Sequence, residues 1–152
     1  MDIAIDNLES GDVIELLQEH MQDMLATSPP ESVHALNVEA LKNPEITFFS
    51  SREDNQLLGC VAIKELSANH AELKSMRTVS RSRNSGVGSK LLEHVLTVAK
   101  HRGYKKISLE TGSMDFFRPA RSLYKKFGFS YCKPFGDYEY DPNSKFMEIN
   151  LS

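Results

Sequence analysis

The sequence is poor in cysteine and in paired metal-ligand motifs, and both shortages exclude classes of protein. Its two cysteines, Cys60 and Cys132, stand alone within apolar segments, without the C-x-x-C spacing of zinc and redox sites. They predict reduced core thiols of a cytoplasmic protein rather than a disulfide scaffold. The five histidines show no H-E-x-x-H or paired spacing, so we expect no metal.

Long apolar runs and an excess of positive charge are also missing. No apolar run approaches the roughly 20 residues that cross a bilayer, and the first residues carry acids where a signal peptide carries cations. The net charge of -3 gives no overall attraction to nucleic acid. We therefore expect neither a membrane nor a nucleic-acid partner, and one domain that spans residues 1–152.

The spacing of apolar residues predicts alternating strands and helices. Residues 2–8 alternate as a strand does, and Ser10 can cap a following helix that Pro29 and Pro30 end. A second, shorter helix is expected at about residues 33–41. The other expected elements are strands at 45–51, 57–66, 71–79, 105–111, 129–132 and 145–151, and helices from Val87 to Gly103 and from Arg118 to Gly128. Together they predict the α/β class, with one mixed, mostly antiparallel sheet of about six to seven strands and about four helices.

The segment "RSRNSGVGSK", residues 81–90, joins a predicted strand to a predicted helix. It lacks the upstream glycine and the Gly-Lys pair of a Walker A loop, and Leu91 stands where a dinucleotide fingerprint needs its third glycine. Two readings remain: a glycine-rich turn, or a cradle in which the amides at the helix N-terminus bind a phosphate group.

Three motifs in order resemble the GNAT superfamily, the Gcn5-related N-acetyltransferases. They are R-x-x-G-x-G (Arg83, Gly86 and Gly88), "ELKSMRTV" before it and "ARSLYKKFGF" after it. The order of expected elements along nearly the whole chain is also similar to that family. The resemblance implies a cytoplasmic enzyme that moves an acetyl group from acetyl-CoA to an amine by direct attack in a ternary complex.

The resemblance also implies a cofactor site without metal. The loop amides would hold the pyrophosphate of acetyl-CoA, and the preceding strand would pair with its pantetheine arm. The residues implied are Met76, Arg77, Thr78, Arg83, Asn84, Ser85, Gly86, Val87, Gly88 and Ser89. Period-two alternation predicts that Glu72, Lys74, Met76 and Thr78 share one face of the strand. In the family, the amide at Met76 would bind the oxyanion.

Catalytic roles follow from the same resemblance. Counting back from Gly86, Glu72 falls where histone-type members keep their general-base glutamate, and Glu110 in "SLETG" is the alternative base. Tyr124 matches the tyrosine that protonates the leaving sulfur. Its position on an apolar helical stripe also fits a core aromatic residue.

The acceptor side departs from the family pattern. Phe117 stands where many members have an asparagine that contacts the cofactor arm, which puts that contact in doubt. The long connection "GSMDFFRPAR" suggests that Ser113 to Phe116 line the acceptor pocket. In the tail, Asp137 to Tyr140 combine acids and aromatic rings that could receive a cationic amine, or form a solvated loop.

Two other classes of protein compete with an enzyme. A non-catalytic module with this fold would bind CoA as a sensor or as a partner surface, but the presence of both Glu72 and Tyr124 favours an enzyme. A nucleic-acid module would use the cations between Arg77 and Lys90, but that stretch has no interleaved aromatic residues. For the assembly, a homodimer is one alternative.

Overall fold

The computed structural model describes residues 1–34, 37–83 and 85–151. Its elements are β1 (Asp2–Ile5), α1 (Gly11–Thr27), η1 (Pro30–Ser32), α2 (Val38–Leu41), β2 (Ile46–Glu53), β3 (Gln56–Ser67), β4 (His70–Thr78), η2 (Ser80–Ser82), α3 (Val87–His101), β5 (Lys106–Gly112), η3 (Asp115–Phe117), α4 (Arg118–Lys126), β6 (Ser130–Cys132) and β7 (Ser144–Asn150). The three η elements are short 3-10 turns.

The seven strands form one sheet in the order β1-β2-β3-β4-β5-β7-β6. β4 and β5 pair in parallel, and the other neighbouring pairs of the described strands are antiparallel. Parallel neighbours need a crossover connection, which α3 provides. The mixed, mostly antiparallel sheet that the sequence predicts is confirmed.

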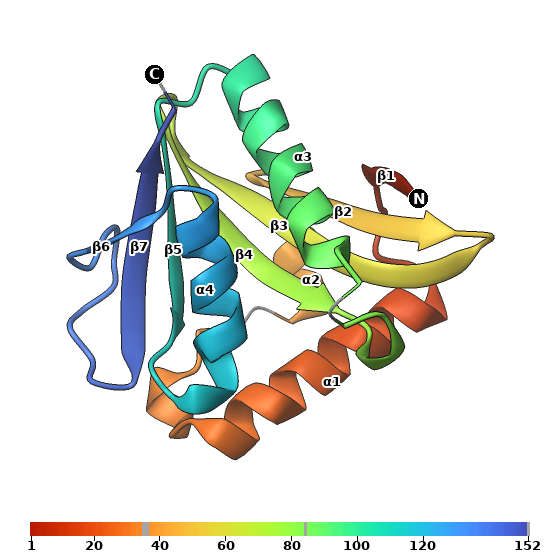
Figure 1. Cartoon of the computed structure of the whole chain (residues 1–152), viewed down its shortest axis with the longest axis horizontal. Coiled ribbons are helices and arrows are strands. Elements are labelled where there is room, and N and C mark those ends of the chain that lie inside the picture. The colour runs from red at the N-terminus through yellow and green to blue at the C-terminus, as the bar shows by residue number, and fades with distance from the viewer. Residues whose placement is uncertain (35–36, 84, 152) are drawn as a thin grey trace.

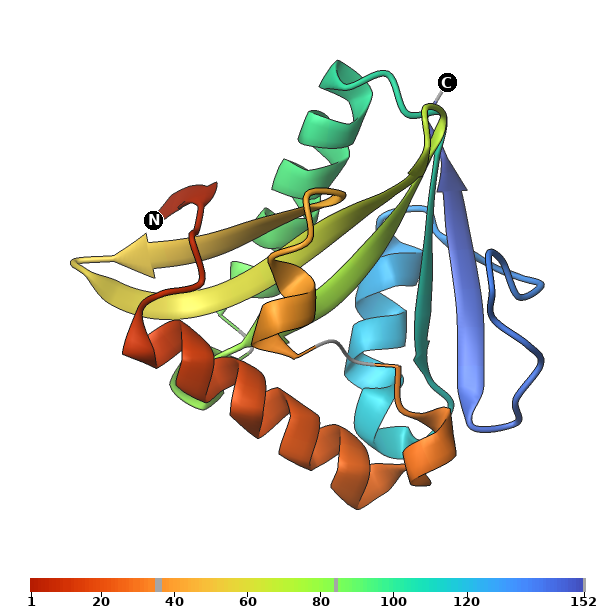
Figure 2. The same ribbon diagram turned by 180° about the vertical axis from the view of Figure 1, so that it is seen from behind.

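Helices cover both faces of this sheet (Figures 1 and 2). On the face covered by α3 and α4, Leu91 and Val95 of α3 are fully buried in the larger core. On the face covered by α1 and α2, Val13 and Leu17 of α1 pack with Cys60 of β3 in a second core. The two cores are separate because successive strand side chains point to opposite faces.

β4 carries one more residue than the strand it faces. Lys74 lies opposite Ala62 and Arg77 opposite Cys60, so three steps along β4 match two along β3. Ser75 lies within the extra step and has a φ of 54°. This is a β-bulge, which bends the strand and leaves local backbone groups outside the ladder.

The bulge reverses the alternation of side chains along β4. Before it, Glu72 and Lys74 share a cavity with residues of α1. After it, the side chains of Met76 and Thr78 lie close to Gly88 of α3. The prediction that these four side chains share one face is therefore wrong, because period-two counting does not include the extra residue.

β4 and β5 separate just before the bulge. Their pairing runs from His70 opposite Lys106 to Leu73 opposite Leu109 and then ends. β4 continues along β3, whereas β5 continues along β7 as far as Gly112. Both views show the two ribbons diverging towards the C-terminal ends of these strands (Figures 1 and 2).

The region before β2 differs from the predicted helix at residues 33–41. Asn37 caps the short α2 by accepting a hydrogen bond from the Ala40 amide at 2.9 Å, and Val33 has extended backbone. Residues 35 and 36 of that prediction lie outside the described residues. Ser10 does precede α1, but its hydroxyl donates to Asp12 instead of capping the helix backbone.

The close packing at the end of β5 leads to a prediction about stability. A β-carbon at Gly112 would lie 2.1 Å from Cδ2 of Phe117. We expect Gly112→Ala to lower the free energy of unfolding by about 1–3 kcal/mol, because the Phe117 ring must move. In urea unfolding, the control Gly11→Ala should change it by less than about 0.5 kcal/mol, since no atom lies within 4 Å of that β-carbon. Equal stability of both variants would contradict the packing.

Candidate active site

The loop before α3 presents the helix N-terminus without a side-chain cap. Gly86 is the N-cap residue, and its φ of 86° belongs to the left-handed region that glycine favours. The amides of Val87, Gly88 and Ser89 begin the helix, and first-turn amides have no acceptor within a helix. Such amides bind anions well, since they lie at the positive end of the helix dipole.

Neighbouring groups fix the shape of this loop. The guanidinium of Arg81 donates to the Leu57 carbonyl at 2.8 Å, which ties the loop to the start of β3. The Ser85 hydroxyl donates to the Ser82 carbonyl within the turn. Arg83 is exposed beside the helix N-terminus, and Asn84 lies outside the described residues.

Gly88 allows α3, β4 and α4 to approach one another. A β-carbon there would lie 3.2 Å from Cδ2 of Leu123 in α4, and 3.8 Å and 3.9 Å from side-chain atoms of Met76 and Thr78. Met76 and Thr78 therefore lie beside the loop, as the resemblance implies for a cofactor arm. A side chain at this position would require the Leu123 side chain to shift by a few tenths of an ångström, so glycine suits this close approach.

The side chain of Arg77 lies on the face of the sheet that α1 covers. Its buried guanidinium donates to Glu19 at 2.8 Å and to Asp23 at 2.5 Å, both on α1. These charge-assisted bonds fix α1 against β4. The side chain thus points away from the loop, which leaves only its backbone for a contact with a cofactor.

Tyr124 lies on α4 with only 5% of its surface exposed. Its ring contacts that of Phe129, with centroids 5.7 Å apart, and it belongs to the larger core. Burial raises the pKa of the Tyr124 hydroxyl far above its usual range, and the nearby Glu110 carboxylate adds to the rise. The hydroxyl therefore keeps its proton at neutral pH.

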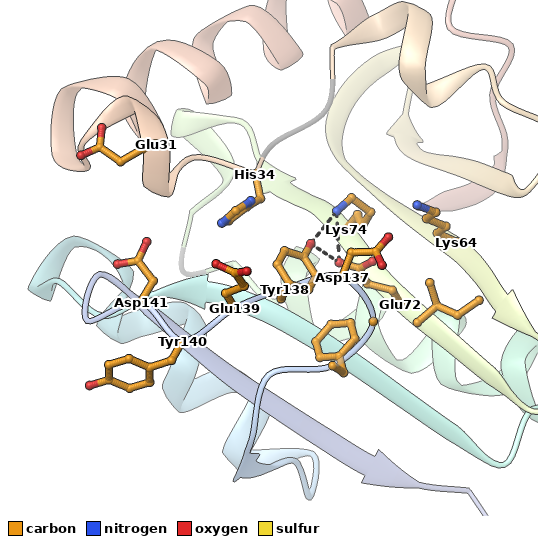
Figure 3. Close-up of a pocket in the computed structure, with 13 residues that line it drawn as sticks. Glu31, His34, Lys64, Glu72, Lys74, Asp137, Tyr138, Glu139, Tyr140 and Asp141 are labelled. Atoms are coloured by element: carbon orange, nitrogen blue, oxygen red, sulfur yellow. Dashed lines mark hydrogen bonds and ion pairs between the residues drawn. The ribbon is translucent and has the colours of Figure 1, made fainter.

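Glu72 is buried and closely paired. Its carboxylate accepts from the Lys74 ammonium at 3.1 Å and from the Tyr138 hydroxyl at 2.5 Å. Lys74 also donates to the Tyr138 hydroxyl at 3.0 Å, so the three side chains form a closed triangle (Figure 3). The Glu72 carboxylate is therefore held by a cation and a hydrogen-bond donor at fixed positions.

Glu110 has the opposite environment. Burial raises the pKa of its carboxyl group to about 7, and the nearby Glu72 carboxylate adds to that rise. Glu110 lines a cavity of about 50 Å³ at the point where β4 and β5 separate, together with Glu72 and Ser75. Its protonation therefore changes near neutral pH, as a general base requires.

α1 supplies an unexpected polar group to this cavity. Nδ1 of His20 is buried and has no hydrogen-bond partner among the described residues, and the same holds for the Ser75 hydroxyl. Both residues line the cavity that holds Glu110. Burial lowers the pKa of His20 to about 4, so its ring is neutral at pH 7.

A larger pocket adjoins the small cavity and shares His34, Glu72, Lys74 and Tyr138 with it. It has a volume of about 420 Å³. Figure 3 shows its charged side chains around a central opening. Its lining residues are Glu31, His34, Lys64, Leu66, Glu72, Lys74, Phe135, Gly136, Asp137, Tyr138, Glu139, Tyr140 and Asp141.

The predicted site residues thus divide between the two faces of the sheet. The loop, Met76, Thr78 and Tyr124 lie on the face of α3 and α4, whereas Glu72 and Glu110 share a cavity on the face of α1. Ser113 to Phe116 are absent from the lining of the 420 Å³ pocket. The Ser113 hydroxyl instead donates to the Pro142 carbonyl at 2.7 Å.

Asp137 to Tyr140, which the sequence offered as a receptor for a cationic amine, line the larger pocket. Sequence reasoning missed the contact of Tyr138 with Glu72, 66 residues away, and it missed His20 and His34 from the N-terminal helical region. No local pattern marks such contacts. Lys74 gave a signal, since it stands two residues after Glu72, but two-residue spacing alone does not predict an ion pair.

The remaining sequence expectations concern thiols, metals and membranes. Cys60 is a buried free thiol, and burial raises its pKa to about 12; Cys132 is also free but only half-buried, in the short strand β6. Among the described residues, no group of three or more histidine, cysteine or acidic side chains is arranged to hold a metal ion. Within the same part of the chain, no helix is long and apolar enough to span a membrane.

The diverging strands and the uncapped helix N-terminus lie where the sequence resemblance places an acyl-CoA site, and comparisons with known proteins identify the family. The model of the acetyltransferase (GNAT) family matches residues 13–129. The chain is 52% identical over 151 residues to the uncharacterized N-acetyltransferase YsnE of Bacillus subtilis, covering 99% of this chain and 100% of that one. It is 46% identical over 149 residues to the uncharacterized N-acetyltransferase YedL of Escherichia coli, covering 98% and 94%.

Solved structures show the same fold. The crystal structure of an aminoglycoside 6'-N-acetyltransferase complexed with coenzyme A matches with a TM-score of 0.72 and 17% identity, over 100% of this chain and 98% of that one. The protein belongs to the GNAT family of acetyltransferases and is an N-acetyltransferase by that membership.

Proposed function

We propose that the protein transfers the acetyl group of acetyl-CoA to a primary amine by direct attack while both substrates are bound. One observation carries this proposal. β4 and β5 separate beyond Leu73 and Leu109, with an uncapped helix N-terminus on one face and a carboxylate-lined pocket on the other. A thioester that enters from the first face can meet an amine that enters from the second.

The cofactor would bind along α3 and β4. The pyrophosphate would accept hydrogen bonds from the amides at the start of α3, with Arg83 as an additional cation. Ser75 and Met76 have no partner in the register of β3, and β5 no longer pairs with β4 at this level. The Met76 amide is therefore our candidate donor to the oxyanion that forms on the thioester carbonyl.

Glu110 is the proposed general base. The amine nitrogen attacks the thioester carbon, the new C–N bond forms, and Glu110 takes a proton from the nitrogen. The C–S bond then breaks, and the departing sulfur takes the proton of the Tyr124 hydroxyl. Glu110 is preferred over Glu72 because its pKa of about 7 suits proton uptake, whereas Glu72 is held by Lys74 and Tyr138.

Cofactor binding is tested by thermal unfolding. Acetyl-CoA at about 100 times its dissociation constant should stabilise the protein by about 2.7 kcal/mol, which raises the melting temperature. ATP at the same concentration serves as the control for any phosphate compound. No shift with millimolar acetyl-CoA would contradict the cofactor proposal. A shift without release of free thiol for any amine would favour a non-catalytic CoA-binding module.

The choice of base is tested by the pH dependence of kcat with an amine that releases thiol. Wild-type kcat should rise with pH up to about 7 and then level off, since only the ionised Glu110 accepts a proton. Glu110→Gln should lower kcat by about 10²–10⁴-fold and remove the inflection. Glu72→Gln should keep the inflection and move it to lower pH, because the Glu72 charge helps to raise the pKa of Glu110. The opposite pattern would make Glu72 the base.

The acid is tested by Tyr124→Phe, which removes one hydroxyl and keeps the ring. We expect turnover to fall by about 10²-fold or more, because the departing thiolate loses its proton donor. Stability should change by less than about 1 kcal/mol, and acetyl-CoA affinity should change far less than turnover. Turnover within about threefold of wild type, with an altered melting temperature, would make Tyr124 a core residue only.

A further inference from the structure

The 420 Å³ pocket carries an unusual concentration of negative charge. Five carboxylates and two lysines line it, so with neutral histidine its net charge is -3, equal to the net charge of the whole sequence. The pocket adjoins the small cavity that Glu110 lines, and the two cavities share four lining residues. It is therefore positioned to hold the part of an acceptor that does not react.

The carboxylates of the pocket differ in whether other protein groups already pair with them. Glu72 is neutralised by Lys74, and Asp141 accepts from the Ser32 hydroxyl at 2.6 Å and from the Asn143 amide at 2.8 Å. In the described part of the chain, no ion pair involves the other three carboxylates. These three are Glu31, Asp137 and Glu139. They face one uncompensated cation, Lys64.

Aromatic rings complete the wall. Phe135, Tyr138 and Tyr140 line the pocket, and the rings of Phe135 and Tyr138 meet edge to face with centroids 5.0 Å apart. The Lys74 ammonium already lies 5.7 Å from the centre of the Tyr138 ring. Such rings attract cations through their quadrupole and exclude water from an alkyl chain.

A second observation marks the inner end of the pocket as a ligand site. His20 is half-buried, but its Nδ1 atom is buried and has no hydrogen-bond partner among the described residues, and the residue lines the cavity beside Glu110. A neutral ring with an unpartnered nitrogen can accept a hydrogen bond from an amine N–H. The unreactive end of the acceptor would then lie outward, near the free carboxylates.

We propose that the acceptor is a small dication: an aliphatic compound with a reacting amine and a second cationic group. The amine reaches Glu110 at the separation of β4 and β5, and the second cation lies among Asp137, Glu139 and Glu31. Lys64 is the feature that would suit a carboxylate instead, but three free carboxylates outweigh one lysine. This inference rests on the proposed acetyl transfer and names the substrate class of the same site.

The experiment uses matched acceptors of equal length. Linear α,ω-diamines of three to six carbons are compared with the monoamine and the ω-amino carboxylate of the same length, which differ only at the far end. We expect kcat/KM for the best diamine to exceed that of its monoamine by about tenfold, the effect of two partly exposed ion pairs. The amino carboxylate should be poorer than the monoamine.

Variants connect the preference to the pocket. Asp137→Asn combined with Glu139→Gln should reduce the ratio of diamine to monoamine kcat/KM to about threefold or less. Glu93→Gln on the exposed side of α3 removes one negative charge away from the pocket and should leave the preference intact. Calorimetry with CoA present measures diamine binding independently of turnover.

Each outcome decides the proposal. Equal kcat/KM for diamine and monoamine, a preference for the amino carboxylate, or no calorimetric binding of any diamine at 10 mM would overturn it. A preference that survives the double variant would overturn the assignment to these carboxylates. The proposed acetyl transfer would stand in all these cases if acetyl-CoA still shifts the melting temperature and another amine releases thiol.

Discussion

The separation of β4 and β5 is the constraint on which the rest of the structure depends. A parallel pair that stops at Leu73 and Leu109 leaves backbone groups without a ladder partner in the middle of a sheet. Buried backbone groups without partners are costly, so such an opening is kept where a ligand completes it. The bulge at Ser75 contributes to the same opening, because it bends β4 and directs Met76 towards α3.

The carboxylates near this opening differ in their hydrogen-bond partners and in their burial. Glu72 and Glu110 have the same functional group and share one cavity, yet only Glu72 accepts hydrogen bonds from Lys74 and Tyr138. Among the described residues Glu110 forms no ion pair, and burial raises the pKa of its carboxyl group to about 7. Arg77 uses two further carboxylates of α1 to fix that helix against the sheet, which closes one side of the cavity. In the proposed mechanism, these different environments assign structural, orienting and proton-accepting roles to the four carboxylates.

Sequence reasoning predicted the sheet, the loop before α3 and the helix that carries Tyr124, because these follow from local patterns. Gly86 illustrates this, since a helix start that needs a positive φ selects glycine. The face of Met76 was predicted wrongly because a bulge adds one residue without a sequence signature. The preference for Glu72 as base came from a count along the chain, which could not include its bond to Tyr138 from a distant loop. Burial and distant partners, which set the pKa of Glu110, exist only in the folded chain.

A crystal structure of the protein with CoA tests the central claim most directly, because it locates the sulfur relative to the separated strands. The account predicts the pyrophosphate on the amides at the start of α3 and the sulfur between β4 and β5, within about 3.5 Å of the Tyr124 hydroxyl. A cofactor that leaves the start of α3 free, or a sulfur that lies away from the separation of β4 and β5, would contradict it.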